Sequence, residues 1–408
     1  MGSTMASRGS VLHLSENLPL PFDRRVWMEL NALRGAGYEV SAICPMGEGG
    51  REPYEVLNGI HIWRYPPPPP ARGFLSYAWE FLYCWLQTAR LSLVVLARRG
   101  FDVIHAANPP DTFWALALPY KIAGKRYVFD HHDLCPELYL ARFGTARRGS
   151  LTCRALEWLE RMQFALADLV ISTNESYRQV ALERGRMSPG RVVVVRSGPS
   201  RERFATVRPV DAALRRGRPF LVAYLGVMAP QDGVDHLLRA ARHLLTLRGR
   251  DDVSFTLVGA GDSFQELQAL TRELGLEAQV HFTGRVPDAE VESILATADV
   301  CVCPDPLNPL NDVSTMNKVL EYMAVGRPIV AYDLREHRRS AAEGALYAQP
   351  NREADLAAKI QELLEDPERR RCMGAYNRRR FLDVMAWEHN AGELLRAYEM
   401  LCGPKRHG

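Results

Sequence analysis

Short apolar runs, separated by longer segments of mixed polar and apolar residues, recur along this chain in two successive blocks. In the first block they occupy residues 11–14, 39–44, 103–105, 127–129, 169–172 and 192–195. In the second block they occupy residues 220–226, 255–258, 280–282, 300–303 and 329–331. Short β-rich runs that alternate with helical segments are typical of parallel sheets with both faces covered. The pattern therefore predicts the α/β fold class, with two doubly wound domains in series.

A change in composition marks the boundary between the two blocks. Residues 200–219 are rich in arginine and show no hydrophobic periodicity. We therefore expect a first domain at 1–205, a linker at 206–219 and a second domain at 220–383. A chain of 408 residues is long enough for two domains of ordinary size.

One segment near the end of the second block combines helix signals with charge. Ser314 or Thr315 is placed to cap a helix, and Gly326 is placed to end it. Asn317, Lys318 and Glu321 lie three or four residues apart and therefore share one helix face. Backbone N–H groups and an ammonium at a helix start suit a phosphate, and a carboxylate one turn later suits ribose hydroxyls. The alternative is a solvated helix face with a Lys–Glu pair.

This segment, which continues into a Met-Ala-x-Gly-x-Pro run at 323–328, resembles the nucleotide-sugar signature of glycosyltransferase family 4, in its bacterial polysaccharide or natural-product type. The resemblance implies a retaining enzyme of the GT-B fold, with two Rossmann-like domains facing a central cleft. It also implies that residues 384–408 form a helix crossing back to the first domain. In the family a Glu-x7-Glu pair ends this region; its second glutamate maps to Glu321, which is expected to bind the ribose. The first maps to Val313, so Asp312 or the backbone N–H groups of residues 311–315 remain the candidates to replace it.

The resemblance places further donor-binding groups at strand ends. Gly226 begins the expected diphosphate loop, but residues 227–234 carry no lysine or arginine. The diphosphate charge is then expected to fall on Lys318, on the helix start at Ser314, Thr315 and Asn317, or on Arg24 and Arg25 across the cleft. The alternative for the two arginines is a surface position in the first turn of a helix. The family binds the nucleobase through backbone groups after the strand at 280–282, here at Arg285 and Val286.

A cluster of polar residues from Asp130 to Glu137 follows another strand. The family carries a histidine here beside the donor sugar, and it maps to His132, with His131 as the second choice. We expect His132 to donate a hydrogen bond to the sugar or the reacting centre. A metal site and a simple hydrogen-bonded loop remain alternatives for the cluster.

Composition excludes several classes of protein. A net charge of +3 and the lack of basic runs with interleaved aromatic residues argue against nucleic-acid binding. The eight cysteines show no CxxC or zinc spacing, and the first ten residues form no apolar signal segment, so we expect a cytoplasmic protein. Residues 74–97 are apolar and aromatic but interrupted by charge. They predict either a helix packed on the first sheet or an amphipathic element in peripheral contact with lipid at the inner face of the membrane or with a greasy acceptor.

Together these features predict a hexosyltransferase acting on a nucleotide-diphospho-sugar, with UDP as the expected nucleotide. The chain contains no Asp-x-Asp triplet, so we expect a donor site without metal or other cofactor. The expected acceptor is a small molecule, a lipid-linked sugar or a glycan, held by the first domain. The family's glycine-rich acceptor loop is replaced by residues 16–22, which contain no glycine. An epimerase of the same fold and a catalytically silent nucleotide-binding partner remain alternatives.

Overall fold

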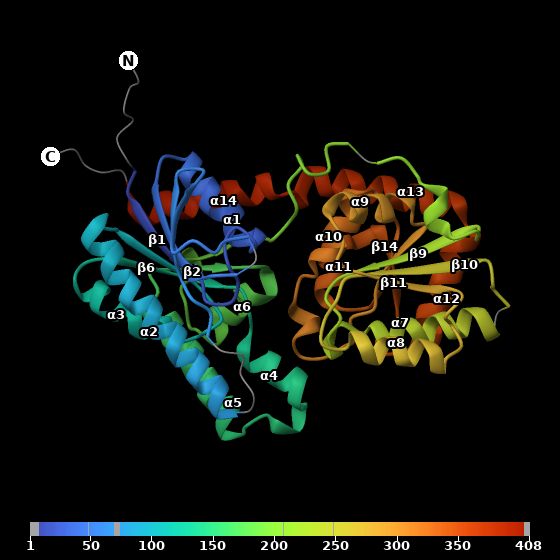
Figure 1. The fold of residues 1–408 in the computed structure, drawn as a ribbon, viewed down its shortest axis with the longest axis horizontal. Helices are drawn as coiled ribbons and strands as arrows, with labels where there is room; N and C mark the ends of the chain where they lie inside the picture. Colours follow the sequence, from blue (N-terminus) through green and yellow to red (C-terminus); the bar gives the residue numbers. More distant parts are fainter. Residues whose placement is uncertain (1–7, 48, 69–73, 207, 248, 404–408) are drawn as a thin grey trace, which may run out of the picture. The chain divides into compact units, whose positions relative to one another are not determined.

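The computed structural model describes residues 8–47, 49–68, 74–206, 208–247 and 249–403, which form two α/β units (Figure 1). Unit 1 comprises Met1–Tyr139, Ala146–Arg196 and Asn390–Gly408, and unit 2 comprises Leu140–Thr145 and Ser197–His389. Apart from Leu140–Thr145, which are grouped with unit 2, the chain passes to unit 2 between Arg196 and Ser197 and returns to unit 1 at Asn390. Each unit contains one sheet and is described by itself.

Unit 1 is built on an eight-stranded sheet in the order β3-β4-β2-β1-β5-β6-β7-β8. Its strands are β1 (Ser10–Leu14), β2 (Glu39–Pro45), β3 (Tyr54–Leu57), β4 (Ile60–Tyr65), β5 (Val103–Ala107), β6 (Arg126–His131), β7 (Leu169–Ser172) and β8 (Val192–Val194). Its helices are α1 (Arg24–Gly35), α2 (Phe74–Arg98), α3 (Phe113–Ile122), α5 (Leu151–Leu166) and α6 (Glu175–Glu183), with parts of α4 (Cys135–Phe143) and α14 (Trp387–Cys402). Among these strands only the β3–β4 pair is antiparallel. All the other neighbouring strands of the sheet pair in parallel, as the sequence predicted.

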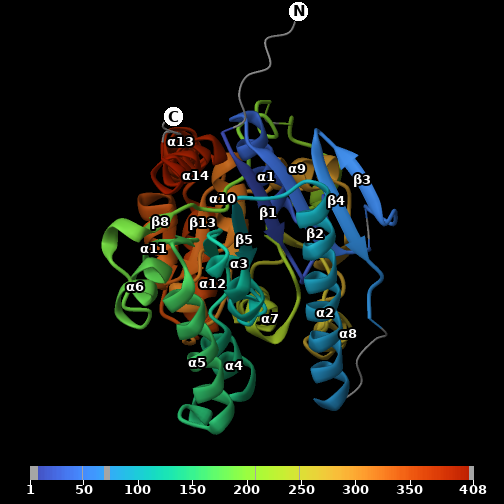
Figure 2. The same ribbon diagram turned by 90° about the vertical axis from the view of Figure 1, so that its left-hand side faces the viewer.

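The sheet of unit 1 buries apolar side chains beneath α2, α3 and α5. Leu12 and Leu14 of β1 join Phe129 of β6 and Phe164 of α5 in one buried cluster. Helix α2 lies beside β2 and β4 (Figure 2). Residues 74–97 therefore form a helix packed on the first sheet, one of the two outcomes that the sequence predicted.

Unit 2 has a six-stranded, wholly parallel sheet in the order β11-β10-β9-β12-β13-β14. Its strands are β9 (Phe220–Leu225), β10 (Val253–Val258), β11 (Val280–Gly284), β12 (Val300–Cys303), β13 (Ile329–Tyr332) and β14 (Ala345–Ala348). Its α-helices are α7 (Val234–Arg242), α8 (Phe264–Glu273), α9 (Asp288–Thr297), α10 (Asn317–Ala324), α11 (Arg335–Ala341), α12 (Glu353–Glu365) and α13 (Pro367–Arg380), with parts of α4 and α14.

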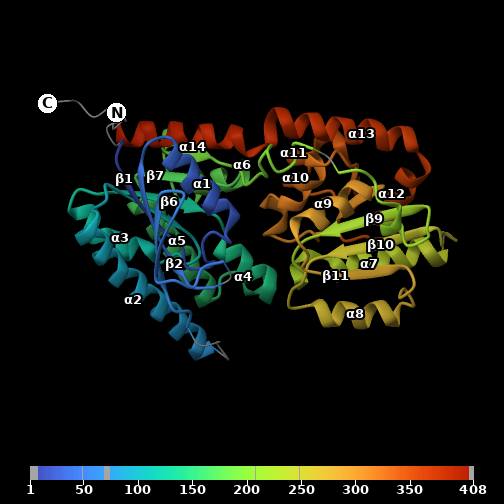
Figure 3. The same ribbon diagram turned by 45° about the horizontal axis from the view of Figure 1, so that its top comes forward.

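Alternation along the strands gives unit 2 a separate core on each face of its sheet. Val222 and Tyr224 point toward α7, α8 and α12, whereas Leu221 and Ala223 point toward α9 and α10. Figure 3 shows α7 and α8 on one side of the strands and α9 and α10 on the other. Every apolar run that the sequence singled out as a strand is a strand. Most of these strands are buried on both faces, whereas the edge strands β8 and β11 are mostly half-buried.

The structure adds three strands that the sequence analysis missed, namely β3, β4 and β14. The β3–β4 hairpin turns at Asn58 and Gly59, whose φ angles of +52° and +77° are those of a two-residue hairpin turn. The Asn-Gly pair was therefore a signal present in the sequence. Strand β14 is only four residues long, and its place at the edge of the sheet beside β13 depends on tertiary pairing.

Candidate functional site

The start of α10 lies at the carboxyl end of the unit 2 sheet and carries most of the predicted donor-binding residues. The N-cap position is Met316, whose side chain makes no capping hydrogen bond. The predicted cap was wrong because both hydroxyl groups have other acceptors: Ser314 donates to the nearby Leu310 carbonyl at 2.9 Å and Thr315 to Glu336 at 3.4 Å. The first N–H groups of a helix have no intrahelical acceptor, so this end of α10 can receive an anion. Asn317, the first helical residue, is exposed.

Lys318 lies in the first turn of α10 and is buried, with 7% of its surface exposed. Its ammonium donates to both carboxylate oxygens of Asp305, at 2.9 and 3.0 Å. It lies 3.5 Å from the Tyr224 hydroxyl and 3.8 Å from an Asp232 carboxylate oxygen. The predicted diphosphate cation is therefore held by two acidic side chains that come from the ends of other strands.

Burial and charge act in opposite directions on these groups. Burial disfavours the ammonium, but Asp305, Tyr224 and Asp232 outweigh it and raise the pKa of Lys318 well above its usual value. Burial raises the pKa of Asp232 to about 6, against the opposing effect of Lys318. The cluster thus carries little net positive charge, and the helix N–H groups must share in binding an anionic ligand.

Gly226, predicted to begin the diphosphate loop, lies against Lys318. A Cβ atom at this position would lie 2.8 Å from the Tyr224 hydroxyl and 3.0 Å from Cε of Lys318. The loop that follows is tied down by Asn311, whose amide donates to the Gln231 and Pro306 carbonyls at 2.8 and 2.9 Å. The structure therefore brings Gly226 and Lys318 together.

Glu321 lies one turn further along α10, with 17% of its side chain exposed. It accepts a hydrogen bond from Arg203 at 2.7 Å, and Arg203 also lies 3.6 Å from carboxylate oxygens of Asp288 and Glu292. Arg203 was missed by the sequence analysis, although it stands in the arginine-rich segment that was read as a domain end and linker. A carboxylate fixed in this way can accept from a pair of hydroxyl groups with its remaining lone pairs.

Asp312, the candidate replacement for the first glutamate, has structural partners of its own. It accepts from the backbone N–H of Arg335 at 2.9 Å and forms an ion pair with the Arg335 side chain at 3.4 Å. Arg335 is the first residue of α11, so Asp312 stabilises the start of that helix. The side chain is therefore already engaged in holding its own loop.

The predicted nucleobase loop follows β11. Gly284 accepts a hydrogen bond from the backbone of Gly259 at 2.9 Å, which ties the loops after β10 and β11 together. Arg285 is exposed, while Val286 is half-buried against the core beneath α9 and α10. This loop presents backbone groups at the same carboxyl edge of the sheet as Gly226.

In unit 1, His132 belongs to a buried polar network at the end of β6. Its Nε2 atom lies 2.6 Å from Asp130 and 2.8 Å from Nε of Arg25. The Nε–H group of Arg25 donates to this nitrogen. His105 also contacts Asp130, at 3.2 Å, and its other ring nitrogen lies 2.8 Å from the Tyr398 hydroxyl.

The two arginines predicted at the diphosphate have different environments. Arg24 is exposed, which agrees with the alternative that it is a surface residue. Arg25 is buried, so that alternative is wrong for Arg25. The Arg25 guanidinium pairs with Glu29 at 3.0 Å and with Asp130 at 3.1 Å, and it donates to the Val195 carbonyl at 2.8 Å. Burial opposes ionisation of Asp130, but His132 and Arg25 hold its pKa well below its usual value.

His131, the second-choice histidine, is a core residue. Its ring is completely buried and packs at tilted or edge-on angles against Phe129, Phe164 and Tyr177, with centroid separations between 5.2 and 5.3 Å. Its Nε2 atom lies 3.4 Å from Glu160. His132 is therefore the histidine of the pair that retains some exposure, 15% of its side chain.

Three groups of side chains among the described residues have the spacing of metal ligands. They are His13, Glu29 and His105; Glu29, Asp130 and His132; and Cys303, Asp305 and His337. In each group a protein cation already pairs with a carboxylate: Arg25 with Glu29 and Asp130, and Lys318 with Asp305. The contacts observed in the cluster after β6 are therefore those of a hydrogen-bonded loop, one of the two alternatives named for residues 130–137.

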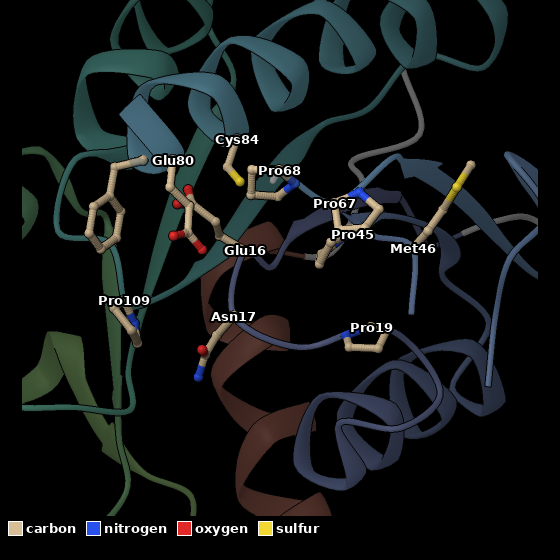
Figure 4. Close-up of a pocket in the computed structure, with 11 residues that line it drawn as sticks. Glu16, Asn17, Pro19, Pro45, Met46, Pro67, Pro68, Glu80, Cys84 and Pro109 are labelled. Carbon is tan, nitrogen blue, oxygen red and sulfur yellow. The ribbon is translucent and has the colours of Figure 1, made fainter. Parts of the chain in front are cut away.

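Unit 1 also contains a cavity at the carboxyl end of its sheet, with a volume of about 320 Å³. It is lined by Glu16, Asn17, Pro19, Pro45, Met46, Pro67, Pro68, Glu80, Phe81, Cys84 and Pro109. These residues follow β1, β2, β4 and β5 or lie on α2 (Figure 4). Ligands of open α/β sheets bind at this edge, so the segment 16–22, which replaces the family's glycine-rich loop, borders a binding-sized space.

Helix α2 leaves part of its surface uncovered. Trp79, Leu82, Leu86 and Leu93 have 49–60% of their surface exposed, and their spacing of three, four and seven residues places them on one side of the helix. Among the described helices, none combines the length and the apolar character needed to cross a bilayer.

Comparisons with known proteins were made for the whole chain. Residues 23–198 match the family model described as glycosyl transferase 4-like domain, and residues 219–366 match the one described as glycosyl transferases group 1. The alpha-D-kanosaminyltransferase of Streptomyces kanamyceticus is 27% identical, over 86% of this chain and 91% of its own length. The MMP alpha-(1->4)-mannosyltransferase of Mycolicibacterium hassiacum is 30% identical, over 76% of this chain and 73% of its own length.

Solved structures share the fold. The crystal structure of Anabaena Alr3699/HepE in complex with UDP superposes with a TM-score of 0.70 and 15% identity, covering 96% of this chain and all of that one. This likeness extends over both units. It agrees with two parallel-sheet Rossmann-like units of the kind that the sequence predicted.

Proposed function

Since the chain belongs to the group 1 and 4-like glycosyltransferases with the GT-B fold, we propose that it moves a hexose or N-acetylhexosamine from UDP, with retention and without a metal ion, to an acceptor hydroxyl. The observation that carries the donor assignment is the arrangement of Glu321, Lys318 and Gly226 around the start of α10. Two relatives are named as transferases, so an epimerase or a silent binding partner has no specific support.

The donor would be held from its nucleoside to its sugar along the carboxyl edge of unit 2. Glu321 accepts from the two ribose hydroxyls, and the backbone after β11 at Arg285 and Val286 reads the base. The N–H groups at the start of α10 and the Lys318 ammonium receive the diphosphate. UDP is supported by its presence in the similar HepE structure.

The chemistry proposed here needs no enzymic nucleophile. The acceptor hydroxyl attacks the anomeric carbon from the face that the diphosphate leaves, and a leaving phosphate oxygen accepts the hydroxyl proton. Lys318 and the helix N–H groups stabilise the negative charge that develops on the diphosphate. His132, oriented by Asp130, donates to the sugar from its position at the end of β6. Metal independence is supported by the lack of an Asp-x-Asp triplet, because protein groups must then meet the charge.

Calorimetric titration of UDP, GDP, ADP and dTDP in the presence of EDTA tests the donor site. We expect UDP to bind and Glu321→Ala to weaken its binding more than tenfold, which corresponds to about 1.4 kcal/mol. Glu292→Ala is the matched control, because Glu292 also lies beside Arg203 but outside the proposed ribose contact. Equal affinity of wild type and Glu321→Ala for the bound nucleotide would disprove the central assignment.

Retention is tested on the product. Transfer from an α-linked donor should give an α-linked product, read from the anomeric coupling constant by NMR. A β-linked product would show inversion and would exclude the proposed same-face attack.

We also propose that the exposed side of α2 contacts lipid, as a peripheral and reversible attachment. Its support is the single stripe formed by Trp79, Leu82, Leu86 and Leu93, since exposed aromatic and aliphatic residues on one helix face suit a bilayer interface. Co-sedimentation with anionic vesicles should be lost in the Trp79→Ser/Leu86→Ser variant and kept in Leu118→Ser, which alters an exposed leucine on α3. Wild-type protein that stays in the supernatant would contradict the proposal.

A further inference from the structure

The cavity in unit 1 brings two carboxyl groups together from distant parts of the chain. Glu16 lies two residues after β1, and Glu80 lies on α2. Figure 4 shows the two carboxyl groups next to one another, with Cys84 and Pro68 beside them. The cavity is large enough for a ring of monosaccharide size, since ligand pockets begin at about 300 Å³.

The carboxyl group of Glu16 lacks hydrogen-bond donors from the described protein residues at one of its oxygen atoms. Its Oε2 atom is buried and has no hydrogen-bond partner among the residues that the structure describes. Burial and, as the smaller cause, the charge of Glu80 together raise the pKa of its carboxyl group to about 8. The groups that act electrostatically on Glu16 or respond to it are Glu80, Tyr65 and Cys84, all of them acidic or neutral.

The described lining around the pair offers no compensating cation. None of the described residues that line the cavity is a lysine or an arginine. A carboxylate removed from water is costly unless a cation or several hydrogen-bond donors replace the water. The empty cavity avoids this cost by keeping Glu16 protonated, and a ligand with its own positive charge would remove the need for that proton.

We propose that this cavity binds the acceptor through a protonated amine, received between Glu16 and Glu80, so that the acceptor is an amine-bearing sugar or cyclitol. The acceptor role rests on the proposed glycosyl transfer, whereas recognition of the amine rests only on the cavity. The remaining lining suits a saccharide ring, because Pro45, Pro67 and Phe81 offer apolar surface to its C–H face. A neutral polyol is less well matched, because its hydroxyl groups would leave two neighbouring carboxyl groups without a counter-charge.

Binding to the full-length protein tests the inference with three matched probes. They are methyl α-D-glucosaminide, its N-acetyl derivative and methyl α-D-glucoside, which differ only in the charge and size of the group at C2. We expect the amine to bind at least tenfold more tightly than either neutral probe, a difference of about 1.4 kcal/mol. Glu16→Gln and Glu80→Gln should each remove this preference. Glu175→Gln, at an exposed carboxylate of α6, should keep it.

Proton exchange gives a second readout that a merely structural pair would not produce. The Glu16 carboxyl group is protonated below pH 8 in the empty cavity, and the ammonium is best received by the ionised form. Binding of the amine at pH 7 should therefore release a proton, measured as a buffer-dependent binding enthalpy in phosphate and in HEPES. Its affinity should rise between about pH 6 and pH 8, and Glu16→Gln should abolish the release.

The outcomes separate this inference from the proposed donor site. Equal binding of all three probes would show that the cavity takes neutral polyols and would overturn amine recognition. No binding of the amine at about 10 mM, in protein that still binds UDP, would overturn the inference and leave the donor assignment intact. Amine binding without any nucleotide binding would instead support the cavity and disprove the donor site. If the Glu16→Gln and Glu80→Gln variants melt at the same temperature as the wild-type protein, loss of folding does not explain their loss of amine preference.

Discussion

The ion pair between Lys318 and Asp305 offers the sharpest test of the unit 2 site. Asp305→Asn keeps the shape of the side chain but removes its negative charge. The Lys318 ammonium donates its two shortest hydrogen bonds to this carboxylate. At 2.9 Å and an effective dielectric constant of about 20, Coulomb's law gives an attraction of roughly 6 kcal/mol. Breaking one half of a buried pair usually costs about 3–5 kcal/mol, because the other charge stays buried.

We expect the lower end of that range, since Asp232 at 3.8 Å retains part of the attraction. A loss of about 3 kcal/mol in a unit of this size lowers the melting temperature by roughly 6–12 °C. Differential scanning calorimetry measures this for Asp305→Asn, for Lys318→Met and for the double variant. The double variant should recover much of the loss, because no unpaired charge remains.

Nucleotide binding then distinguishes a structural lysine from a diphosphate cation. In Asp305→Asn the ammonium lacks its main partner, so UDP should raise the melting temperature more than it does in wild type. The exposed pair of Arg371 and Glu368 gives the control: Glu368→Gln should change neither the melting temperature nor the response to UDP. A change below about 2 °C in Asp305→Asn would refute the reasoning on burial, and an unaltered UDP response would remove Lys318 from the diphosphate site.

Three further predictions follow from the charges of the two units. Arg25→Met should lower the stability of unit 1 by about 3–5 kcal/mol, because it leaves Asp130 buried without its guanidinium; Arg24→Met, at an exposed neighbour, is the calorimetric control and should have little effect. The pKa of Asp232 is raised by burial to about 6, so its contribution to stability is greatest below about pH 4 and is lost as the pH rises through 6. Urea unfolding of Asp232→Asn should lack this decline, which amounts to about 3 kcal/mol, and a parallel pH profile of the two proteins would contradict the burial of Asp232. Gly226→Ala should lower the melting temperature and weaken UDP binding together, since a Cβ atom would press on Tyr224 and Lys318; normal UDP affinity in this variant would show that the loop does not depend on that close approach.

The sequence alone identified most of the segments that form strands and the end of α10. Apolar runs such as 220–226 and 300–303 are strands because parallel sheets need side chains that can be buried on both faces. Gly326 ends α10 with a φ angle of +69°, as the stop signal predicted, because a left-handed residue at a helix end favours glycine. Where the signal was weaker, as in the four-residue β14, the strand was missed.

The helix cap and the charge partners were beyond reach of local patterns. Ser314 and Thr315 stand at the expected distance before α10, yet their hydroxyl groups donate to Leu310 and Glu336 instead. Arg203 was read as part of a domain end and linker, although it is the residue that holds Glu321. For Thr315 and Glu321 the partner comes from another segment of the chain, whose position depends on how the sheet is assembled. Ser314 instead donates to a carbonyl in its own segment.

Sequence by itself thus determined which segments become strands and helices, because backbone preference and the burial of apolar side chains are largely local properties. Tertiary structure decided which charges meet. Lys318 could be recognised as a cation at a helix start, but its pairing with Asp305 arises because α10 and β12 place these residues 2.9 Å apart. Glu16 and Glu80 are 64 positions apart in the chain, yet they line one cavity because the fold brings β1 and α2 together. Coulomb energy depends on distance in space and on burial, and neither is written in the spacing of residues along the chain.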